Sequence, residues 1–201
     1  MRKIIKAKYL IDGTGAKPVE NPVILIEDGA ILRITTESEA ASLKDAEVID
    51  ASDRTVLPGL IDGHVHTGWG TELKPGWNGV KDDPEKLLLW GVRSAQSLLL
   101  DGITTARDCG GPGSVPFRIR DGIQAGLIAG PRLLIAGSVL TTTAGHCHFF
   151  GIESNTADAL RAGVRQLVQR GVDFIKIMAS GGMLTPMSNR RRAQYSVQEL
   201  T

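Results

Sequence analysis

The sequence has few of the features that would assign it to a secreted, membrane or nucleic-acid-binding class. Two cysteines, Cys109 and Cys147, cannot form a disulfide framework, so free thiols are expected. With 23 basic and 22 acidic residues, the net charge of +1 gives no basic surface for nucleic acid or membranes. No apolar run is long enough to span a bilayer, and Asp12 interrupts the basic start before a signal-peptide core can form. We therefore expect a soluble cytoplasmic globular protein.

The first part of the chain, residues 1–57, has the pattern of a small β-rich segment. Short β-rich runs are separated by Asp12-Gly13 and Asp28-Gly29, and Asp-Gly between such runs is a hairpin signal. The pattern predicts a small antiparallel sheet. Pro58-Gly59 marks the boundary with the second part, residues 58–201.

After Pro58 short apolar runs alternate with helical periodicity, which is typical of an α/β protein. The runs GLIDGHVH, GITTARDCG, RLLIAGSVL and DFIKIMASGG suit parallel strands that are buried on both faces. Helices are expected after Asp83-Pro84, from Val115 and after Thr156, each ending near a glycine. Their apolar stripes are Leu88, Val92, Ala95 and Leu99; Ile119, Ile123 and Leu127; and Leu160, Val164, Leu167 and Val168.

The spacing of these elements predicts the N-terminal part of a (β/α)8 TIM-like barrel. A complete barrel takes roughly 250 residues, so residues 58–201 would supply about four strand–helix units. At the end, Ser196 and Glu199 form a capping box that starts one more helix. The expectation is the front half of a longer protein.

Histidine is scarce, and its four copies form two pairs. His64 and His66 follow the first barrel run, and His146 and His148 follow the third. Residues two apart on a strand face the same side, and barrel enzymes place their sites at the carboxyl ends of the strands. Two neutral imidazoles there can bind one divalent metal ion. For a bare H-x-H pair, a hydrogen-bonded core pair would be at least as common.

The context of the first pair resembles a known family. PGLIDGHVHTG, residues 58–68, is similar to the first-strand signature of the amidohydrolase superfamily, which comprises metal-dependent hydrolases built on a distorted barrel. The segment before it resembles their small β-sandwich, and the later runs DGITTARDCGG, GPRLLIAGSVLT and GVDFIKIMASGG agree in order. The resemblance covers essentially the whole chain. It is greatest to the branch of imidazolonepropionase-like enzymes and metal-dependent Xaa-Pro dipeptidases.

Lys176 is the residue of the fourth run with the most specific chemical role in the resemblance. In DFIKIMAS it lies among apolar residues. Apolar surroundings lower the pKa of a lysine, and the neutral amine is a nucleophile. A lysine that reaches the rim is the alternative. The resemblance implies that Lys176 takes up carbon dioxide as a carbamate that bridges two divalent metal ions, with zinc favoured, and that His64 and His66 bind the outer ion. Imidazolonepropionase itself resembles the chain but lacks the bridging lysine.

Other residues were assigned substrate-side or structural roles. The resemblance implies that His146 contacts the substrate and that Tyr195 presents its hydroxyl to the reacting centre. His148 is more simply a packed loop histidine, and Cys147 has no second thiol at zinc-ligand spacing. The glycine-rich CGGPGS has no phosphate-binding pattern. NRRRAQ, residues 189–194, could attract a substrate carboxylate, but a solvated loop is the more common explanation of such a charge run.

The resemblance also implies residues that this sequence does not contain. The family draws further histidines from the fifth and sixth strands and an aspartate base from the eighth. Two functions therefore stay open: part of a hydrolase that cleaves an amide by a metal-activated hydroxide, in a dipeptide (Xaa-Pro), an N-acyl amino acid or a cyclic amide, or a non-catalytic fragment. The expected partners are a small amide substrate and either a second copy or the missing C-terminal half.

Overall fold

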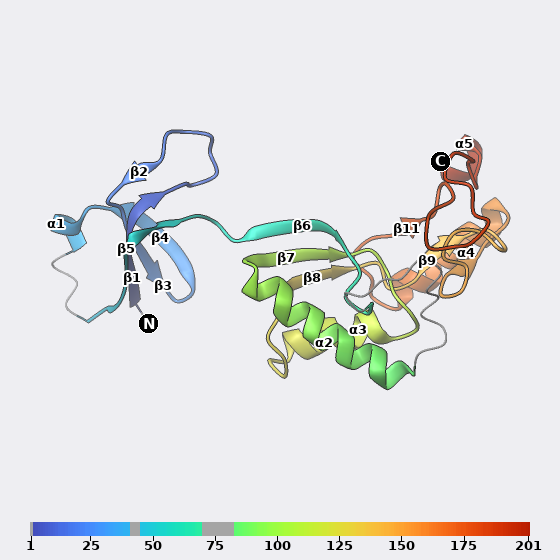
Figure 1. Ribbon diagram of the computed structural model, residues 1–201, viewed down its shortest axis with the longest axis horizontal. Helices are drawn as coiled ribbons and strands as arrows, with labels where there is room; N and C mark the ends of the chain where they lie inside the picture. Colours follow the sequence, from blue (N-terminus) through green and yellow to red (C-terminus); the bar gives the residue numbers. More distant parts are fainter. Residues whose placement is uncertain (1, 41–44, 70–82) are drawn as a thin grey trace. The chain divides into compact units, whose positions relative to one another are not determined.

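The protein consists of two compact units. The computed structural model describes residues 2–40, 45–69 and 83–201, and the chain divides into Met1–Pro58 and Gly59–Thr201 (Figure 1). Each unit has its own sheets and apolar core, so each is described by itself. Within the described ranges, none of the helices combines the length and the apolar character needed to cross a membrane.

The first unit is a five-stranded sheet with one short helix. Its elements are β1 (Arg2–Leu10), β2 (Val19–Glu20), β3 (Val23–Glu27), β4 (Ala30–Thr35), α1 (Glu37–Ala40) and β5 (Glu47–Val56). β1 pairs antiparallel with β2 and β3 but parallel with β5. The expectation of a purely antiparallel sheet is therefore wrong. Two residues of turn can join antiparallel neighbours, whereas the longer connection between β4 and β5 returns the chain in the parallel sense.

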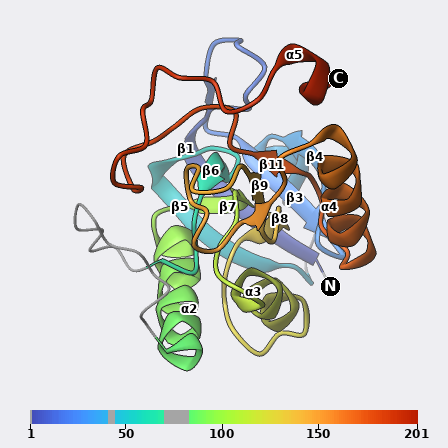
Figure 2. The same ribbon diagram turned by 90° about the vertical axis from the view of Figure 1, so that its right-hand side faces the viewer.

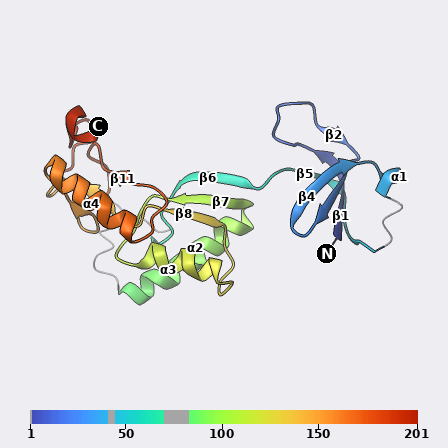
Figure 3. The same ribbon diagram turned by 180° about the vertical axis from the view of Figure 1, so that it is seen from behind.

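The second unit contains two small parallel sheets. One has the order β6 (Leu60–Val65), β7 (Ile103–Asp108), β8 (Arg132–Ile135), and the other the order β10 (Ile152–Glu153), β9 (Val139–Thr141), β11 (Lys176–Ile177). All strand pairs in both sheets are parallel, which confirms the α/β class (Figures 1 and 3). The parallel order β6, β7, β8/β9, β11 is that of four consecutive barrel strands.

The run RLLIAGSVL, expected as one strand, forms both β8 and β9. The break falls at Gly137, whose φ of +68° favours glycine. The start of the run, β8, pairs with β7, and its end, β9, pairs with β11. At the break, Ile135 N donates to the Asp173 carboxylate at 2.8 Å and Asp173 N donates to the Ile135 carbonyl at 2.9 Å. This stagger connects the second and fourth barrel strands, β7 and β11, through a single segment.

Four helices accompany these strands, and their starts follow the sequence signals. They are α2 (Pro84–Leu100), α3 (Val115–Gln124), α4 (Ala157–Gln169) and α5 (Val197–Leu200), which lie around the strands in Figure 2. The Asp83 side chain accepts from Glu85 N and the Thr156 side chain accepts from Ala159 N, as N-caps do. The capping box of Ser196 and Glu199 is present. These caps were predicted from the sequence and are confirmed.

The buried face of α2 differs from the predicted stripe. Leu87, Gly91 and Ala95 are buried, whereas Leu99 is 36% exposed. Gly91 explains the rotation, because the missing side chain lets the fully buried Ile119 of α3 approach the helix. A scan for large apolar residues cannot find a contact made by a glycine. Two other predicted stripe residues are also exposed, Leu127 after α3 and Val168 in α4.

This contact predicts a difference between two helical glycines. Gly91→Ala should destabilise the protein by about 1–3 kcal/mol, since core overpacking has that cost. The new methyl would lie 1.8 Å from Ile119 Cδ1, which has no solvent to move into. Gly122→Ala is the matched control, because its methyl would meet only Ile128 at 3.5 Å while gaining up to about 1 kcal/mol of helix propensity. Urea denaturation measures both; equal midpoints would contradict the packing argument.

Candidate metal centre

The first histidine pair lies at the carboxyl end of β6. His64 is in the strand and His66 follows it directly, with ring centroids 5.3 Å apart. The Asp62 side chain accepts a hydrogen bond from His64 N at 3.0 Å and so fixes the backbone that leads into His64. Both imidazoles thus stand at the rim of the barrel sheet where the sequence placed them.

His66 is held in one orientation by two contacts. Its Nδ1 lies 2.7 Å from the carbonyl oxygen of Gly110, and its ring stacks on Trp69 with centroids 4.1 Å apart and planes within 7°. A carbonyl only accepts hydrogen bonds, so Nδ1 carries the hydrogen and Nε2 keeps a free lone pair. This is the arrangement by which proteins orient a metal-binding histidine.

Lys176 reaches the same place from the fourth strand position. It begins β11, pairs in register with Val139, and its Nζ lies 3.5 Å from His64 Nε2. Phe174, two residues earlier, lies under the guanidinium of Arg107 at 4.0 Å, and Arg107 also donates to the Gly63 carbonyl at 3.2 Å. Lys176 therefore points to the strand-lined side, toward β6, and not to the helices.

The electrostatics of this cluster favour neutral imidazoles. Burial lowers the pKa of His64, and the positive charges of Lys176 and Arg107 lower it further. The pKa of His66 is also lowered, mainly by burial. Deprotonated imidazole is the form that binds metal, so both rings are ready to bind at neutral pH.

The residues present fit part of a metal site. Two histidine nitrogens and one lysine that could carry a carbamate give the donor types of a divalent ion. In residues 2–40, 45–69 and 83–201, no group of three or more His, Cys, Asp and Glu side chains is arranged to hold a metal. A metal here would thus need ligands in addition to His64 and His66, as the sequence led us to expect.

Asp108 is a structural residue of the site that the sequence analysis did not identify. It ends β7, is completely buried, and accepts hydrogen bonds from Thr67 N at 3.1 Å, from the Thr67 hydroxyl and from Gly110 N at 2.9 Å. Thr67 is next to His66 in the sequence, and the carbonyl of Gly110 is the hydrogen-bond partner of His66 Nδ1. One carboxylate therefore fixes both sides of the second imidazole. An acidic residue at the carboxyl end of a parallel strand was the available signal.

His146 lies in the loop after β9, close to the lysine. Its Nδ1 is 3.2 Å from the Thr185 hydroxyl, and its backbone N donates to the Gln194 side chain at 2.6 Å. Burial and then the charge of Lys176 lower the pKa of its imidazole. Its ring also packs on the backbone of Gly182, where an added methyl would lie 2.2 Å from Nε2. The side chain is thus held near the candidate metal centre.

Cys147 and His148, the two residues after His146, make local contacts. His148 Nδ1 lies 2.9 Å from the Gly145 carbonyl, and its ring packs edge-on against Phe149, as a loop histidine does. Cys147 is buried, and burial raises the pKa of its thiol to about 12. A thiol that stays protonated is a poor zinc ligand, which agrees with the weak zinc signal in the sequence.

The expected role of Tyr195 is not supported by its placement. Its hydroxyl donates to the Ser154 carbonyl at 2.9 Å, and its ring is buried in a cluster with Leu140, Leu160 and Leu167. Burial raises the pKa of this phenol to about 12. The neighbouring Gln194 instead bonds to the backbone of His146. Residues 194 and 195 lie in an irregular loop, where the hydrogen bonds of each side chain decide its direction.

Comparison with known proteins agrees with this site. The sequence model of the amidohydrolase family matches residues 55–201. Ochratoxinase of Aspergillus niger is 28% identical over 98% of the chain and 46% of its own length. A crystal structure of a Xaa-Pro dipeptidase with bound methionine superposes with a TM-score of 0.88 at 29% identity, covering 100% of this chain and 52% of its own. Imidazolonepropionase of Bacillus cereus is 44% identical over 26% of the chain and 12% of its own length.

The fold and the comparisons together define the family of this chain. The chain belongs to the amidohydrolase family. It spans about half the length of the ochratoxinase and of the dipeptidase to which it is similar.

Proposed function

We propose that this chain is the N-terminal part of a metal-dependent amidohydrolase that hydrolyses an amide bond in a dipeptide or N-acyl amino acid. The observation that carries the proposal is the approach of Lys176 Nζ to His64 Nε2, 3.5 Å apart, at the carboxyl ends of two strands that are not neighbours. Chemistry-bearing residues from separate strands meet at this rim in barrel enzymes. The names of the ochratoxinase and the Xaa-Pro dipeptidase support an amide substrate.

Each residue has a distinct role in this proposal. His64 and His66 would hold one divalent ion, and Lys176, as a carbamate, would add two oxygen ligands. Two ions, with zinc favoured, would supply Lewis acidity at the amide carbonyl and a lower pKa for a water. The Gly110 carbonyl and the Trp69 ring keep His66 from rotating, which holds the lone pair of Nε2 in place.

His146 is the proposed contact to the substrate carbonyl. The Thr185 hydroxyl accepts from Cys147 N at 2.8 Å and can donate its own hydrogen to His146 Nδ1. The hydrogen of the neutral ring then resides on Nε2, which lies 3.5 Å from Cys147 Sγ. In the proposed role this N–H turns from the sulfur to a carbonyl oxygen as that oxygen gains negative charge. Because burial lowers the pKa of this imidazole, it acts as a neutral donor.

A second candidate function is that of a non-catalytic fragment, for residues 1–201 taken alone. Within the described part of the chain the ligand set stops at two histidines and one lysine. A metal with so few ligands binds weakly, and the family's aspartate base would have to come from elsewhere. We propose that the site is completed by barrel strands outside these residues, and that residues 1–201 by themselves are not catalytic.

The test compares residues 1–201 with the complete polypeptide, in which further barrel strands continue the chain. We expect the complete polypeptide to contain divalent metal, to hydrolyse N-acetyl amino acids or Xaa-Pro dipeptides, and to lose this activity on chelation until zinc is returned. Residues 1–201 alone should show no appreciable hydrolysis. Metal analysis and a ninhydrin assay give both results. Turnover by the metal-free complete polypeptide would refute the proposal, and turnover by residues 1–201 would refute the need for further strands.

A further inference from the structure

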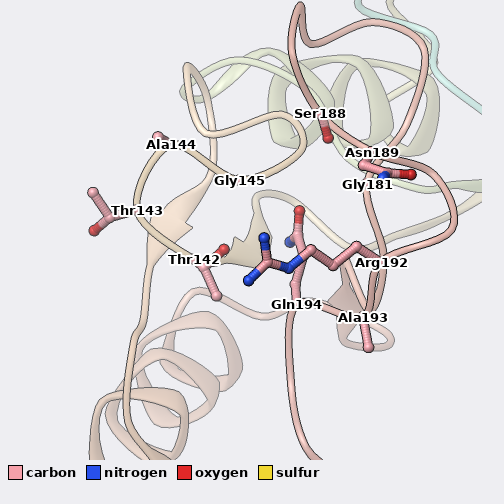
Figure 4. Close-up of a pocket in the computed structure, with 10 residues that line it drawn as sticks. All are labelled: Thr142, Thr143, Ala144, Gly145, Gly181, Ser188, Asn189, Arg192, Ala193 and Gln194. Carbon is pink, nitrogen blue, oxygen red and sulfur yellow. The ribbon is translucent and has the colours of Figure 1, made fainter.

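A polar cavity lies beside the candidate metal centre and is not used by the proposed chemistry. It has a volume of about 390 Å³, and residues 142–145 after β9 and residues 181–194 after β11 form its walls (Figure 4). Both loops follow the carboxyl ends of parallel strands, so the cavity is on the same rim as His64 and Lys176. Its volume is within the range of small-molecule pockets, about 300–1,000 Å³.

Arg192 is the charged residue that faces this cavity. Figure 4 shows its guanidinium extending from the 181–194 loop toward the side formed by Thr142. Among the described residues, no carboxylate is within ion-pair distance of Arg192, and its side chain makes no hydrogen bond with them. The nearby Glu153 is engaged with the Thr143 hydroxyl at 2.9 Å and with Ala144 N at 3.4 Å. The guanidinium is therefore free to bind an anion.

The walls of the cavity are formed before any ligand binds. Thr143 N donates to Asn155 Oδ1 at 2.8 Å, which ties the first loop to the chain after β10. In the second loop, Gly182 N donates to Ser188 Oγ at 3.1 Å and Arg192 N to the Asn189 carbonyl at 3.1 Å. Ordered walls lower the entropy that binding must overcome.

Gln194 connects the cavity to the candidate metal centre. It lines the cavity, while its Oε1 accepts from His146 N at 2.6 Å and its Nε2 donates to the Met178 carbonyl at 2.7 Å. Met178 is two residues from Lys176. A substrate whose scissile amide lies between Lys176 and His146 would thus extend its other end into this cavity.

We propose that this cavity is the subsite for the carboxylate of the substrate and that Arg192 is its specificity-determining residue. A guanidinium binds a carboxylate through two parallel N–H donors, which gives both strength and orientation. This inference rests on the proposed function, since it assigns the substrate class of the same site: amides of amino acids with a free carboxylate.

The experiment measures binding separately from turnover. Isothermal titration of the complete polypeptide uses N-methylsulfonyl-L-alanine, which has no carboxamide bond to hydrolyse, and its uncharged analogue N-methylsulfonyl-L-alaninamide. Wild type should bind the carboxylate about tenfold more tightly, since a charge-assisted hydrogen bond is about twice as strong as a neutral one. Arg192→Gln should remove this preference, Arg192→Lys should keep part of it, and the matched control Arg191→Gln, one position away in the same exposed loop, should keep all of it.

The outcomes separate this subsite from the proposed chemistry. A preference that survives Arg192→Gln, or one that Arg191→Gln removes equally, would overturn the subsite, as would equal binding of the two ligands by wild type. Inorganic phosphate that binds as tightly and with the same dependence on Arg192 would show a general anion site and also overturn it. If the Arg192-dependent preference persists but no amide is hydrolysed, the subsite stands and the proposed function fails.

Discussion

Lys176→Ala in the complete polypeptide should remove bound metal and amide hydrolysis together. If the side chain bridges two ions as a carbamate, the truncation deletes a ligand to each of them at once. We expect a loss of activity of about 100-fold or more, since changing partners that only orient ligands already costs 10–100-fold. Metal content is the deciding measurement, because activity alone could fall through misfolding. Inductively coupled plasma mass spectrometry of the folded variant gives it directly.

Two further variants separate a bridge from a simple positive charge. Lys176→Glu should keep part of the metal, because a carboxylate also offers two oxygens, although on a shorter side chain. Acetate added to the alanine variant should restore some metal by the same chemistry. Lys17→Ala, at an exposed position in the first unit, should leave metal content unchanged. Full metal occupancy in folded Lys176→Ala without added acid would rule out the bridge, and a rim lysine would change stability by only about 0.5 kcal/mol.

The parts of the fold that sequence could predict have local causes. Asp83 caps α2 and Thr156 caps α4, and each depends only on a side chain and a backbone N–H two or three residues on. The convergence of His64 with Lys176 was also accessible, because strand alternation and the parallel order of strands place both on one side. Strand alternation can therefore place residues that are distant in the sequence on one side of the barrel, because the parallel order of the strands repeats.

The parts that sequence could not predict depend on contacts across the fold. The face of α2 is set by Gly91, which matters only because Ile119 packs against it from another helix. The parallel pairing of β5 depends on where a long connection returns. The hydrogen bonds of Tyr195 to Ser154 and of Gln194 to His146 arise in an irregular loop, which gives no periodicity by which to orient the two side chains. In each case the information lies in a neighbour that is distant in the sequence.

The role of Asp108 in the site also depends on contacts across the fold that the sequence does not show. Replacing Asp108 is the second change for which we expect a large effect. Asp108→Ala should destabilise the protein by about 3 kcal/mol, because it leaves buried donors at Thr67 and Gly110 without their charged acceptor. It should also weaken zinc binding by the complete polypeptide about 10–100-fold, because His66 loses the support on both of its sides. Urea denaturation and competition with a zinc chelator measure the two effects.

The two measurements distinguish a carboxylate that positions His66 from one that only supports the core. Asp101→Ala is the control, since this exposed aspartate follows α2 and its replacement should change stability by no more than about 0.5 kcal/mol. Asp108→Asn keeps the shape and one accepting oxygen but turns an amide toward a backbone N–H, so it should give intermediate losses in both measurements. A less stable Asp108→Ala that binds zinc as tightly as Asp101→Ala would limit Asp108 to packing. Parallel losses across the series would show that the strand end of β7 orients the imidazole at the end of β6.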